Sequence, residues 1–352
     1  MTKVVVAMSG GVDSSVAVAL LQQQGYEVVG MMLRLWSESG KEDSNRCCTP
    51  DAMALARRVA AKLDIPFYVV DAKDEFRKTV VEYFLEGYAR GETPNPCLVC
   101  NRQIRWEFLL NRALALGADF MATGHYVRKR DIGDKHQLLR AVDRSKDQSY
   151  VLHVLNQEKL KRALFPVGDY AKPEIRKIAE SFGLPTASRH DSQDLCFLAG
   201  DDYRNFLQRN AAEMLKPGQI VRRDGEVVGV HRGLANYTIG QRKGLGVSSP
   251  MPLYVLGKDA AANTVIVGAQ DELGSRELIA YDVNWISGEA PSESFRAEVK
   301  IRYTAKEAPA LVMPTDDEQV RVQFDVPQRD VTAGQAAVFY QGDVLLGGGL
   351  IR

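Results

Sequence analysis

The first 200 residues carry two kinds of hydrophobic pattern: short apolar runs, and longer stretches whose apolar residues recur every three or four positions. Short β-branched runs predict buried strands, and the longer stretches predict helices. Strands are expected at residues 3–8, 27–33, 67–70 and 119–123. Helices are expected at residues 16–21, 50–63, 74–88, 104–116 and 173–182. Strands that alternate with helices predict a parallel, doubly wound α/β sheet, in which a ligand lies beyond the carboxyl ends of the strands.

The pattern changes after about residue 204. Helical periodicity fades after a last stretch at residues 204–214, and short β-rich runs separated by turn signals follow. In the final part, strands are expected at residues 283–286, 296–303, 320–324, 336–340 and 344–350. Several short strands with regular turns predict a small β-barrel. We therefore expect an α/β domain at 1–204, a small β-rich domain at 205–275 and a C-terminal β-barrel at 276–352.

Proline and polar residues predict where regular structure starts or stops. Thr49 and Pro50 are typical of a helix start, as an N-cap followed by proline at the first helical position. Residues 93–101 have the sequence TPNPCLVCN, and their two prolines are expected to prevent regular structure. Residues 143–150 have the sequence DRSKDQSY, and their polarity predicts a surface loop.

The first strand–helix connection contains the most informative chemistry. Residues 9–15 have the sequence SGGVDSS, a short glycine-rich turn directly before a helix. Such a turn points backbone N–H groups and a helix N-terminus at one place, which suits a phosphate group. The loop lacks the GK[ST] ending of a Walker P-loop and also lacks G-x-G-x-x-G. An ordinary glycine turn is the alternative, but the complete SGGVDS motif in this position favours phosphate binding.

Composition narrows the class of protein. The 352 residues are 45% hydrophobic and 26% charged, and no apolar stretch approaches the ~20 residues of a membrane span. The sequence begins directly in a strand pattern, so we expect no signal peptide, no membrane partner and a cytoplasmic location. Lys plus Arg and Asp plus Glu both number 45, which gives no overall attraction to nucleic acid. Any RNA contact must come from local basic clusters, for which 128–130, 222–223 and 242–243 are candidates.

Five cysteines are confined to the first 196 residues. A structural disulfide framework is not expected in a cytoplasmic chain. Cys47 and Cys48 precede a helix and are interpreted as small packing residues. Cys97, Cys100 and Cys196 remain as candidates for thiol chemistry.

Seven sequence blocks occur in one order along the chain: SGGVDS, TPNPCLVCN, ATGHY, KDQSY, SQDLCF, IGQRKGLG and GQAAVFYQGDVLLGGGLI. SGGVDS resembles the PP-loop of the ATP pyrophosphatases, which cleave ATP between the α and β phosphates. Together the blocks, from Lys3 to Ile351, resemble the tRNA-specific 2-thiouridylase family. The resemblance implies a PP-loop fold and an ATP- and Mg2+-dependent transferase that thiolates the wobble uridine, U34, of tRNA. The C2 oxygen would be adenylated, and cysteine-borne sulfur would then displace AMP.

The resemblance also implies roles for individual residues. ATP would be bound by Ala7, Met8, Ser9, Gly10, Gly11, Val12, Asp13, Ser14, Leu33 and Gly124. Asp13 would lie near Mg2+. The target base would meet Asn95, Pro96 and Cys97, and further tRNA contacts would come from His125, Lys146, Asp147, Gln148, Arg302, Tyr303 and Gln335. Cys100 would be the nucleophile and Cys196 the persulfide carrier.

The use of two cysteines suits the chemistry. The C2 carbonyl of uridine is a poor electrophile, and adenylation turns its oxygen into a leaving group. If a persulfide carries the sulfur, one cysteine bears the terminal sulfur atom and a second breaks the S–S bond. That exchange requires a thiolate and close approach. Cys100 and Cys196 are far apart in the sequence, so only the fold could bring them together.

Cys97 departs from the pattern of some family members, which carry Asp here for a proposed acid–base role. Cys97 and Cys100 form a C-x-x-C pair, and Cys196 would add a third thiolate. Three thiolates could hold a [4Fe–4S] cluster and leave one iron open to carry sulfide. The sequence therefore leaves the persulfide and iron–sulfur routes open. A zinc site would need a fourth ligand, which the sequence does not make evident.

Two other functions remain as alternatives. The first is a PP-loop ligase or amidotransferase-like enzyme that adenylates a small metabolite and needs no paired cysteines. The second is a non-catalytic module that binds ATP or RNA. For the 2-thiouridylase function, the expected partners are the anticodon arm of tRNA and a sulfur donor such as a cysteine desulfurase or a sulfur-relay protein. The sequence does not specify the tRNA set or the oligomeric state.

Overall fold

A parallel sheet organises the N-terminal part of the chain. The computed structural model describes residues 1–41, 49–189, 195–198, 200–315 and 317–352. The sheet has the order β3-β2-β1-β4-β7. Its strands are β1 (Lys3–Ala7), β2 (Glu27–Arg34), β3 (Phe67–Asp71), β4 (Phe120–Thr123) and β7 (Ala163–Leu164). All neighbouring strands pair in parallel, so the expected α/β fold is confirmed.

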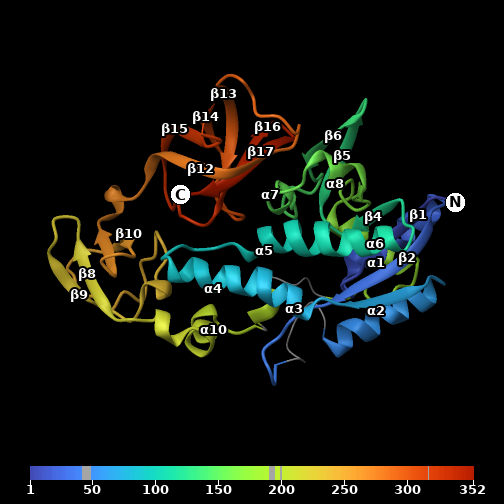
Figure 1. Cartoon of the computed structure of the whole chain (residues 1–352), viewed down its shortest axis with the longest axis horizontal. Helices are drawn as coiled ribbons and strands as arrows, with labels where there is room; N and C mark the ends of the chain where they lie inside the picture. The colour runs from blue at the N-terminus through green and yellow to red at the C-terminus, as the bar shows by residue number, and fades with distance from the viewer. Residues whose placement is uncertain (42–48, 190–194, 199, 316) are drawn as a thin grey trace.

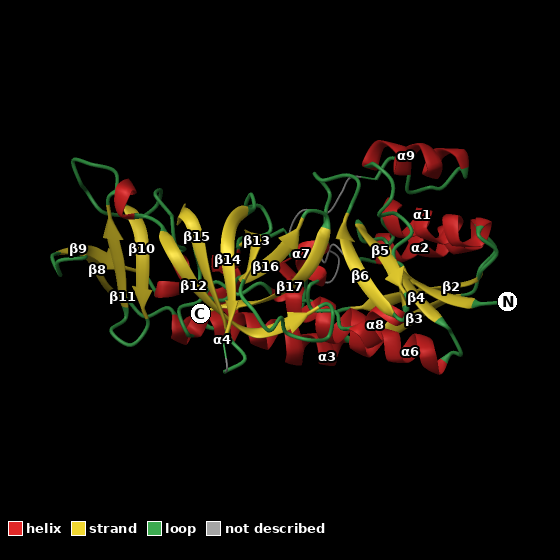
Figure 2. Cartoon of the chain, turned by 90° about the horizontal axis from the view of Figure 1, so that it is seen from above, coloured by secondary structure: helices red, strands yellow, loops and turns green. Residues whose placement is uncertain are grey.

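Helices cover both faces of this sheet because alternate residues of β1 point to opposite sides. Val5 lies in one apolar cluster, whereas Val4 and Val6 lie in the other. One face is covered by α1 (Val12–Gln23), α2 (Pro50–Lys62) and α9 (Lys172–Ser181). The other face is covered by η3 (Cys100–Leu109), which is π-helical, and α6 (Leu110–Ala115). Figure 2 shows α1, α2 and α9 on one side of the strands and α6 on the other.

The remaining helical segments are short or continue one another. Segments α3 (Lys73–Phe76), η2 (Arg77–Val81, π-helical) and α4 (Glu82–Ala89) form one run, and α5 (Pro96–Val99) runs directly into η3. The others are α7 (Ser149–Leu152), α8 (Gln157–Lys161), η4 (Cys196–Leu198), α10 (Tyr203–Asn210), η5 (Ala212–Met214), η6 (Leu234–Asn236) and η7 (Gln270–Glu272). Among the helices of the described residues, none has the length and apolar character needed to cross a bilayer.

Two helix starts show how capping residues act. Thr49 caps α2, as expected, by accepting a hydrogen bond from the Ala52 N–H at 3.0 Å. The prediction that prolines keep residues 93–101 irregular is wrong, because α5 begins at Pro96. Proline is tolerated at the first helical position, where its missing N–H is not needed, and the Asn95 side chain caps the Cys97 N–H at 3.2 Å.

The prediction of a surface loop at residues 143–150 holds only for its first part. Asp147, Ser149 and Tyr150 are buried, and α7 begins at Ser149. The Tyr150 hydroxyl donates to the Ala336 carbonyl at 3.0 Å and accepts from the Ala336 N–H at 3.1 Å. These contacts fasten the end of the loop to the C-terminal barrel, which the polar sequence of the segment did not reveal.

The central and C-terminal parts are β structures, at the left and top of Figure 1. The central sheet has the order β10-β11-β8-β9. Its strands are β8 (Gly218–Arg222), β9 (Val227–His231), β10 (Tyr254–Asp259) and β11 (Thr264–Gly268). The C-terminal strands are β12 (Ser275–Trp285), β13 (Phe295–Lys300), β14 (Ala308–Pro314), β15 (Val320–Gln328), β16 (Ala336–Gln341) and β17 (Val344–Ile351). Pairing of β12 with β17 closes them into the expected barrel, whose neighbouring strands are antiparallel.

A hairpin from the N-terminal part joins this barrel, and the sequence did not predict it. Strands β5 (Val127–Ile132) and β6 (Lys135–Arg140) pair with each other, and β6 also pairs with β17. At the junction, the buried Arg140 guanidinium donates to Glu307 at 2.7 Å and to Glu298 at 3.0 Å. It also lies over the Tyr340 ring, 4.0 Å from the centroid. The barrel is thereby attached to the segment that directly follows β4.

Candidate active site

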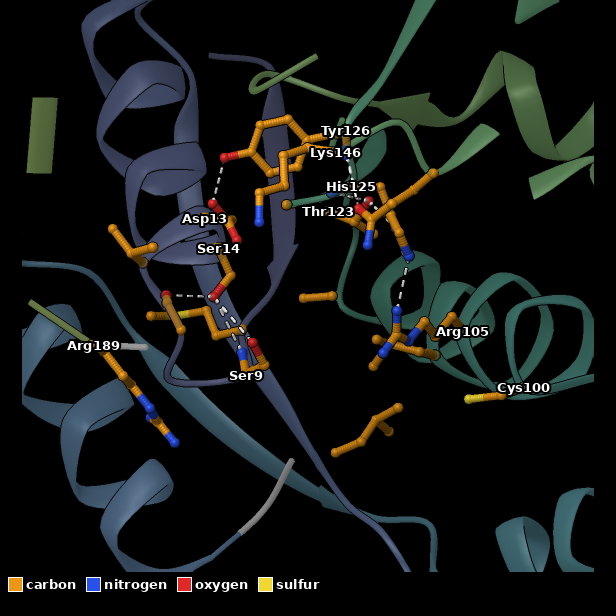
Figure 3. A pocket seen from close by; sticks show the side chains of 18 of the residues that line it. Ser9, Asp13, Ser14, Cys100, Arg105, Thr123, His125, Tyr126, Lys146 and Arg189 are labelled. Atoms are coloured by element: carbon orange, nitrogen blue, oxygen red, sulfur yellow. Dashed lines mark hydrogen bonds between the residues drawn. The ribbon is translucent and has the colours of Figure 1, made fainter. Parts of the chain in front are cut away.

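A cavity of about 650 Å³ lies at the carboxyl ends of β1 and β4. The strand order reverses between these two strands, which is where parallel α/β sheets bind ligands. Of the residues expected to bind ATP, residues 7–9 and 11–14, Leu33 and Gly124 line this cavity. Figure 3 shows the side chains that converge on it from the loop after β1, from β4 and from the helix that carries Cys100.

The SGGVDS loop packs closely against its neighbours at two glycines, where an added side chain would clash. Gly10 adopts a positive φ of 70°, and a Cβ there would lie 2.4 Å from the Ala52 carbonyl oxygen. A Cβ at Gly124 would lie 2.7 Å from the Ser14 nitrogen. Helix α1 begins at Val12, earlier than expected, so Asp13 and Ser14 belong to its first turn. Gly11 caps α1 without a side chain, so the first N–H groups of the helix are not used by a side-chain cap.

Asp13 is paired with a lysine that the sequence analysis did not identify. The Lys172 ammonium lies 2.7 and 2.9 Å from the two Asp13 carboxylate oxygens, and the Tyr126 hydroxyl donates to Asp13 at 2.7 Å. Lys172 is buried and stands at the start of α9. Its backbone N–H donates to Asp143 at 3.0 Å. No local pattern marks Lys172 in the sequence, because its partner lies far away along the chain.

The described lining of the cavity carries more positive than negative charge. Arginine or lysine side chains come from four positions, and Asp13 is the carboxylate among them; the cations are Arg105, Lys146, Lys172 and Arg189. Arg189 also donates to the Gly10 carbonyl at 2.7 Å, which fixes it against the loop. A polar cavity with this balance suits an anionic ligand such as a nucleotide.

Thr123, His125 and Arg105 form a chain of hydrogen bonds along one wall. Arg105 can only donate, so at 2.9 Å the Nε2 atom of His125 accepts, and Nδ1 carries the proton. That Nδ1–H donates to the Thr123 hydroxyl at 2.7 Å. Burial, with a smaller effect of the Arg105 charge, lowers the pKa of His125 well below its ordinary value. His125 is therefore neutral at physiological pH, and both ring nitrogens have partners within the protein.

The three candidate cysteines lie on three helical segments, α5, η3 and η4. Cys100 is buried on η3 and lines the cavity. Cys196 is half-buried in η4 and packs against the same apolar cluster as Cys100, a cluster that also contains Phe84 and Phe197. Cys97 is half-buried in the first turn of α5. Cys100 and Cys196, distant in sequence, are thus brought to one apolar cluster.

The structure gives no support to the iron–sulfur route. Within the described residues, which include all three of these cysteines, no three His, Cys, Asp or Glu side chains form a group that could hold a metal ion. Cys47 and Cys48 lie outside the described residues, so their interpretation as packing residues stays a prediction.

The residues expected to meet tRNA fall into two groups. His125, Lys146, Gln148 and Tyr303 line the cavity. Tyr303 is 42% exposed, and burial, followed by the charges of Asp147 and Cys97, raises the pKa of its hydroxyl.

The second group lies outside the cavity and holds loops in place. Asp147 accepts from the Ala141 N–H at 2.9 Å, and the Arg302 guanidinium donates to Thr332 and to the Ile239 carbonyl. Gln335 donates to the Thr93 carbonyl at 2.7 Å, which joins the barrel to the TPNPCLVCN segment. Asn95 and Pro96 begin α5 in that same segment.

Family comparisons cover nearly the whole chain. Residues 2–200 match the tRNA methyl transferase HUP domain, residues 204–269 match the tRNA methyl transferase PRC-barrel domain, and residues 275–351 match the Aminomethyltransferase beta-barrel domain. Among solved structures, the chain is similar to a 4-thiouridine synthetase in complex with RNA and bound ATP. The TM-score is 0.35 and the identity 19%, over 60% of this chain and 51% of that one, which is too weak to support an inference.

Curated relatives are much closer. The tRNA-specific 2-thiouridylase MnmA of Acetivibrio thermocellus is 47% identical over 355 residues, which cover 99% of this chain and 99% of that protein. The corresponding protein of Carboxydothermus hydrogenoformans is 49% identical and that of Roseiflexus castenholzii 48%, with 99% and 100% of this chain and 97% and 99% of theirs covered. At this identity and coverage, the chain belongs to the tRNA-specific 2-thiouridylase family.

Proposed function

We propose that this chain is an ATP-dependent tRNA uridine 2-sulfurtransferase that thiolates the wobble uridine, U34. One observation carries the proposal: the SGGVDS loop and Cys100 line the same cavity. The reaction needs a site that activates the C2 oxygen with ATP and a thiol that handles sulfur, and both must reach the same base. A metabolite-adenylating ligase would need the loop but not the thiol.

The nucleotide end of the cavity is the SGGVDS loop. This end is lined by the Ser9 and Ser14 hydroxyls and by the cationic Lys172 and Arg189. The first N–H groups of α1 face it as well. Together they favour a bound polyphosphate. Asp13 is the carboxylate in the described lining that would hold the Mg2+ of MgATP, and the ammonium group of Lys172 now neutralises it. Mg2+ needs few protein ligands when phosphates and water supply the rest.

In the first step, the C2 oxygen of U34 attacks the α-phosphorus of ATP. The bond between this phosphorus and the α–β bridging oxygen breaks, pyrophosphate leaves, and the N3 proton is lost to solvent. The base must leave the anticodon stack to reach the cavity. Tyr303, which is partly exposed at the cavity, is placed to contact the displaced base.

In the second step, the terminal sulfur of a persulfide on Cys196 attacks C2. The C2–O bond breaks, and AMP leaves with the bonding electrons. The Cys100 thiolate then attacks the Cys196 sulfur, so that the S–S bond to the transferred sulfur breaks and 2-thiouridine is released. A Cys100–Cys196 disulfide remains. A dithiol reductant must supply two electrons and two protons to convert it back to two thiols. Packing of both cysteines against one apolar cluster supports this route.

The sulfur on Cys196 comes from outside the chain, from a cysteine desulfurase or a sulfur-relay protein. The anticodon arm of tRNA would lie between the cavity and the barrel, since Lys146, Gln148 and Tyr303 line the side of the cavity that the barrel and the 143–150 segment form. Residues such as Gln335 would act there by holding the 93–101 segment.

The test is to supply the purified protein with tRNA lacking 2-thiouridine, ATP, Mg2+, a persulfide-generating desulfurase and a dithiol. Mass spectrometry of the nucleosides should show 2-thiouridine at position 34, in an amount that depends on ATP. Cys100→Ser should abolish the product without loss of the folded protein. Absence of 2-thiouridine with the wild-type protein, or full activity of Cys100→Ser, would contradict the proposal.

A further inference from the structure

Arg105 enters the cavity from the same helix as Cys100. Both residues lie on the π-helical segment η3, and both line the cavity together with Leu109. Figure 3 shows the Arg105 side chain directed at His125, on the wall between the SGGVDS loop and Cys100.

The π-helix explains how these three residues share one face. Along an α-helix each residue turns by about 100°, so a residue five positions on lies about 140° away and one nine positions on lies on the opposite side. Leu109 and Cys100 would then face in opposite directions. Hydrogen bonds in a π-helix run from residue i to i+5, so each residue turns by less than in an α-helix and residues five and nine apart lie closer to one side of the helix. The π register therefore directs both the thiol and the guanidinium into the cavity.

The orientation of the Arg105 guanidinium is fixed by a neutral histidine. His125 accepts from Arg105 at 2.9 Å and donates to Thr123 at 2.7 Å, at the end of β4. Because His125 is uncharged, it holds the guanidinium without repelling it. Such a preset donor needs no reorganisation when negative charge develops near it.

Contacts along this wall set the order of the groups. Gly124 lies against Ser14 of the SGGVDS loop, His125 follows Gly124, Arg105 binds His125, and Cys100 stands on the Arg105 helix. In the adenylated intermediate, the C2 oxygen of the base would be joined to an α-phosphate at the SGGVDS loop, and C2 would have to meet sulfur near Cys100. The base would therefore lie along the wall between the loop and Cys100. On this arrangement, Arg105 would lie next to the C2–O–P linkage.

We propose that Arg105 is a catalytic residue, whose guanidinium contacts the α-phosphate and stabilises the negative charge that develops there in both steps. In the first step, charge grows on the phosphoryl oxygens as pyrophosphate leaves. In the second, it grows on AMP as the C2–O bond breaks and the electron pair passes to oxygen. His125 and Thr123 act as positioning residues for the guanidinium. This inference rests on the proposed function.

The test uses single-turnover thiolation with protein whose Cys196 already carries a persulfide, so that no donor protein is needed. Arg105→Met should lower the rate constant for AMP release about 100-fold or more, as expected for loss of one preset charge-stabilising donor. The Kd for ATP should change less than about three-fold, because the contact strengthens only as charge develops. Arg105→Lys, which keeps a point charge, should recover about ten-fold of the lost rate.

The matched control is Arg112→Met, the same change on α6, where the Arg112 guanidinium lies over the Phe108 ring at 5.2 Å. It should keep the wild-type rate within about two-fold. A further readout is rescue of Arg105→Ala by added guanidinium ion, which a structural role would not produce.

The inference fails if Arg105→Met keeps its rate within about three-fold, if its Kd for ATP weakens as much as its rate, or if guanidinium leaves a folded Arg105→Ala protein inactive. Absence of thiolation by the wild-type protein would instead contradict the proposed function itself.

Discussion

Replacement of Lys172 by Met removes the ammonium group that binds Asp13 and keeps most of the side-chain stem. The ammonium nitrogen lies 2.7 and 2.9 Å from the two carboxylate oxygens. The Lys172 side chain is 9% exposed and that of Asp13 29%. Breaking a fully buried ion pair by removing one partner costs about 3–5 kcal/mol. Partial exposure of Asp13 and its remaining bond from Tyr126 reduce the expected loss, to about 1–3 kcal/mol of unfolding free energy.

The same change should weaken ATP binding. A cation at the phosphate end of the cavity is lost, and a charged hydrogen bond contributes about 1.5–3 kcal/mol, so the Kd for ATP should rise at least about ten-fold. Urea unfolding gives the stability and equilibrium titration gives the Kd. Lys177→Met is the control, because Lys177 is exposed on the same helix; it should match the wild type in both measurements.

A double-mutant cycle separates the ion pair from general damage. Asp13→Asn with Lys172→Met should be more stable than the sum of the two single changes predicts, by about 1–2 kcal/mol. The reasoning is refuted if Lys172→Met leaves the unfolding free energy unchanged within about 0.5 kcal/mol, or if the two changes are additive.

Three further predictions concern other parts of the site and the domain contacts. Gly124→Ala should lower the unfolding free energy by about 1–3 kcal/mol and weaken ATP binding, because its Cβ would lie 2.7 Å from the backbone of the SGGVDS loop. In the control Gly257→Ala, the Cβ would lie 3.6 Å from its nearest neighbour, so neither the unfolding free energy nor the Kd for ATP should change. Cys196→Ser should still release pyrophosphate with tRNA and ATP but form no 2-thiouridine, whereas equal activity of the variant in a nucleoside assay would exclude Cys196 as carrier. Burial lowers the pKa of Lys258 from 10.5 to about 8, so the folded form disfavours the charged lysine. The unfolding free energy of the wild type relative to Lys258→Met should therefore be highest above pH 10.5, fall as the pH drops to about 8, and stay constant below that. Urea unfolding of both proteins at pH 7, 9 and 10.5 measures this difference, and a difference that does not change with pH would contradict the prediction.

Local signals predicted much of the fold. Alternation of short apolar runs with helical stretches gave the parallel sheet, and Thr49 with Pro50 gave the start of α2, because these features act within a few residues. Pro96 is a misleading signal in the sequence, because proline breaks a helix in its interior but is tolerated at the first helical position. The apolar pattern does not show the start of α1, because the first turn of this helix includes the polar Asp13 and Ser14 of the SGGVDS motif.

What the sequence did not disclose depends on contacts between distant segments. The β5–β6 hairpin joins the barrel through pairing with β17, and the Arg140 contacts with Glu298 and Glu307 become visible only when the chain is folded. Lys172 meets Asp13 across the cavity in the same way. Arg105 shares a face with Cys100 only in a π-helix, which helical periodicity does not predict.

Nucleotide activation and sulfur transfer are expected to occur on one base in one cavity. A single turnover of protein that carries a persulfide on Cys196, with tRNA and ATP radiolabelled at the α-phosphate, tests this by counting AMP and 2-thiouridine together. One AMP should form for each 2-thiouridine, and neither should form without tRNA. Formation of 2-thiouridine without AMP, or of AMP without tRNA, would contradict the account.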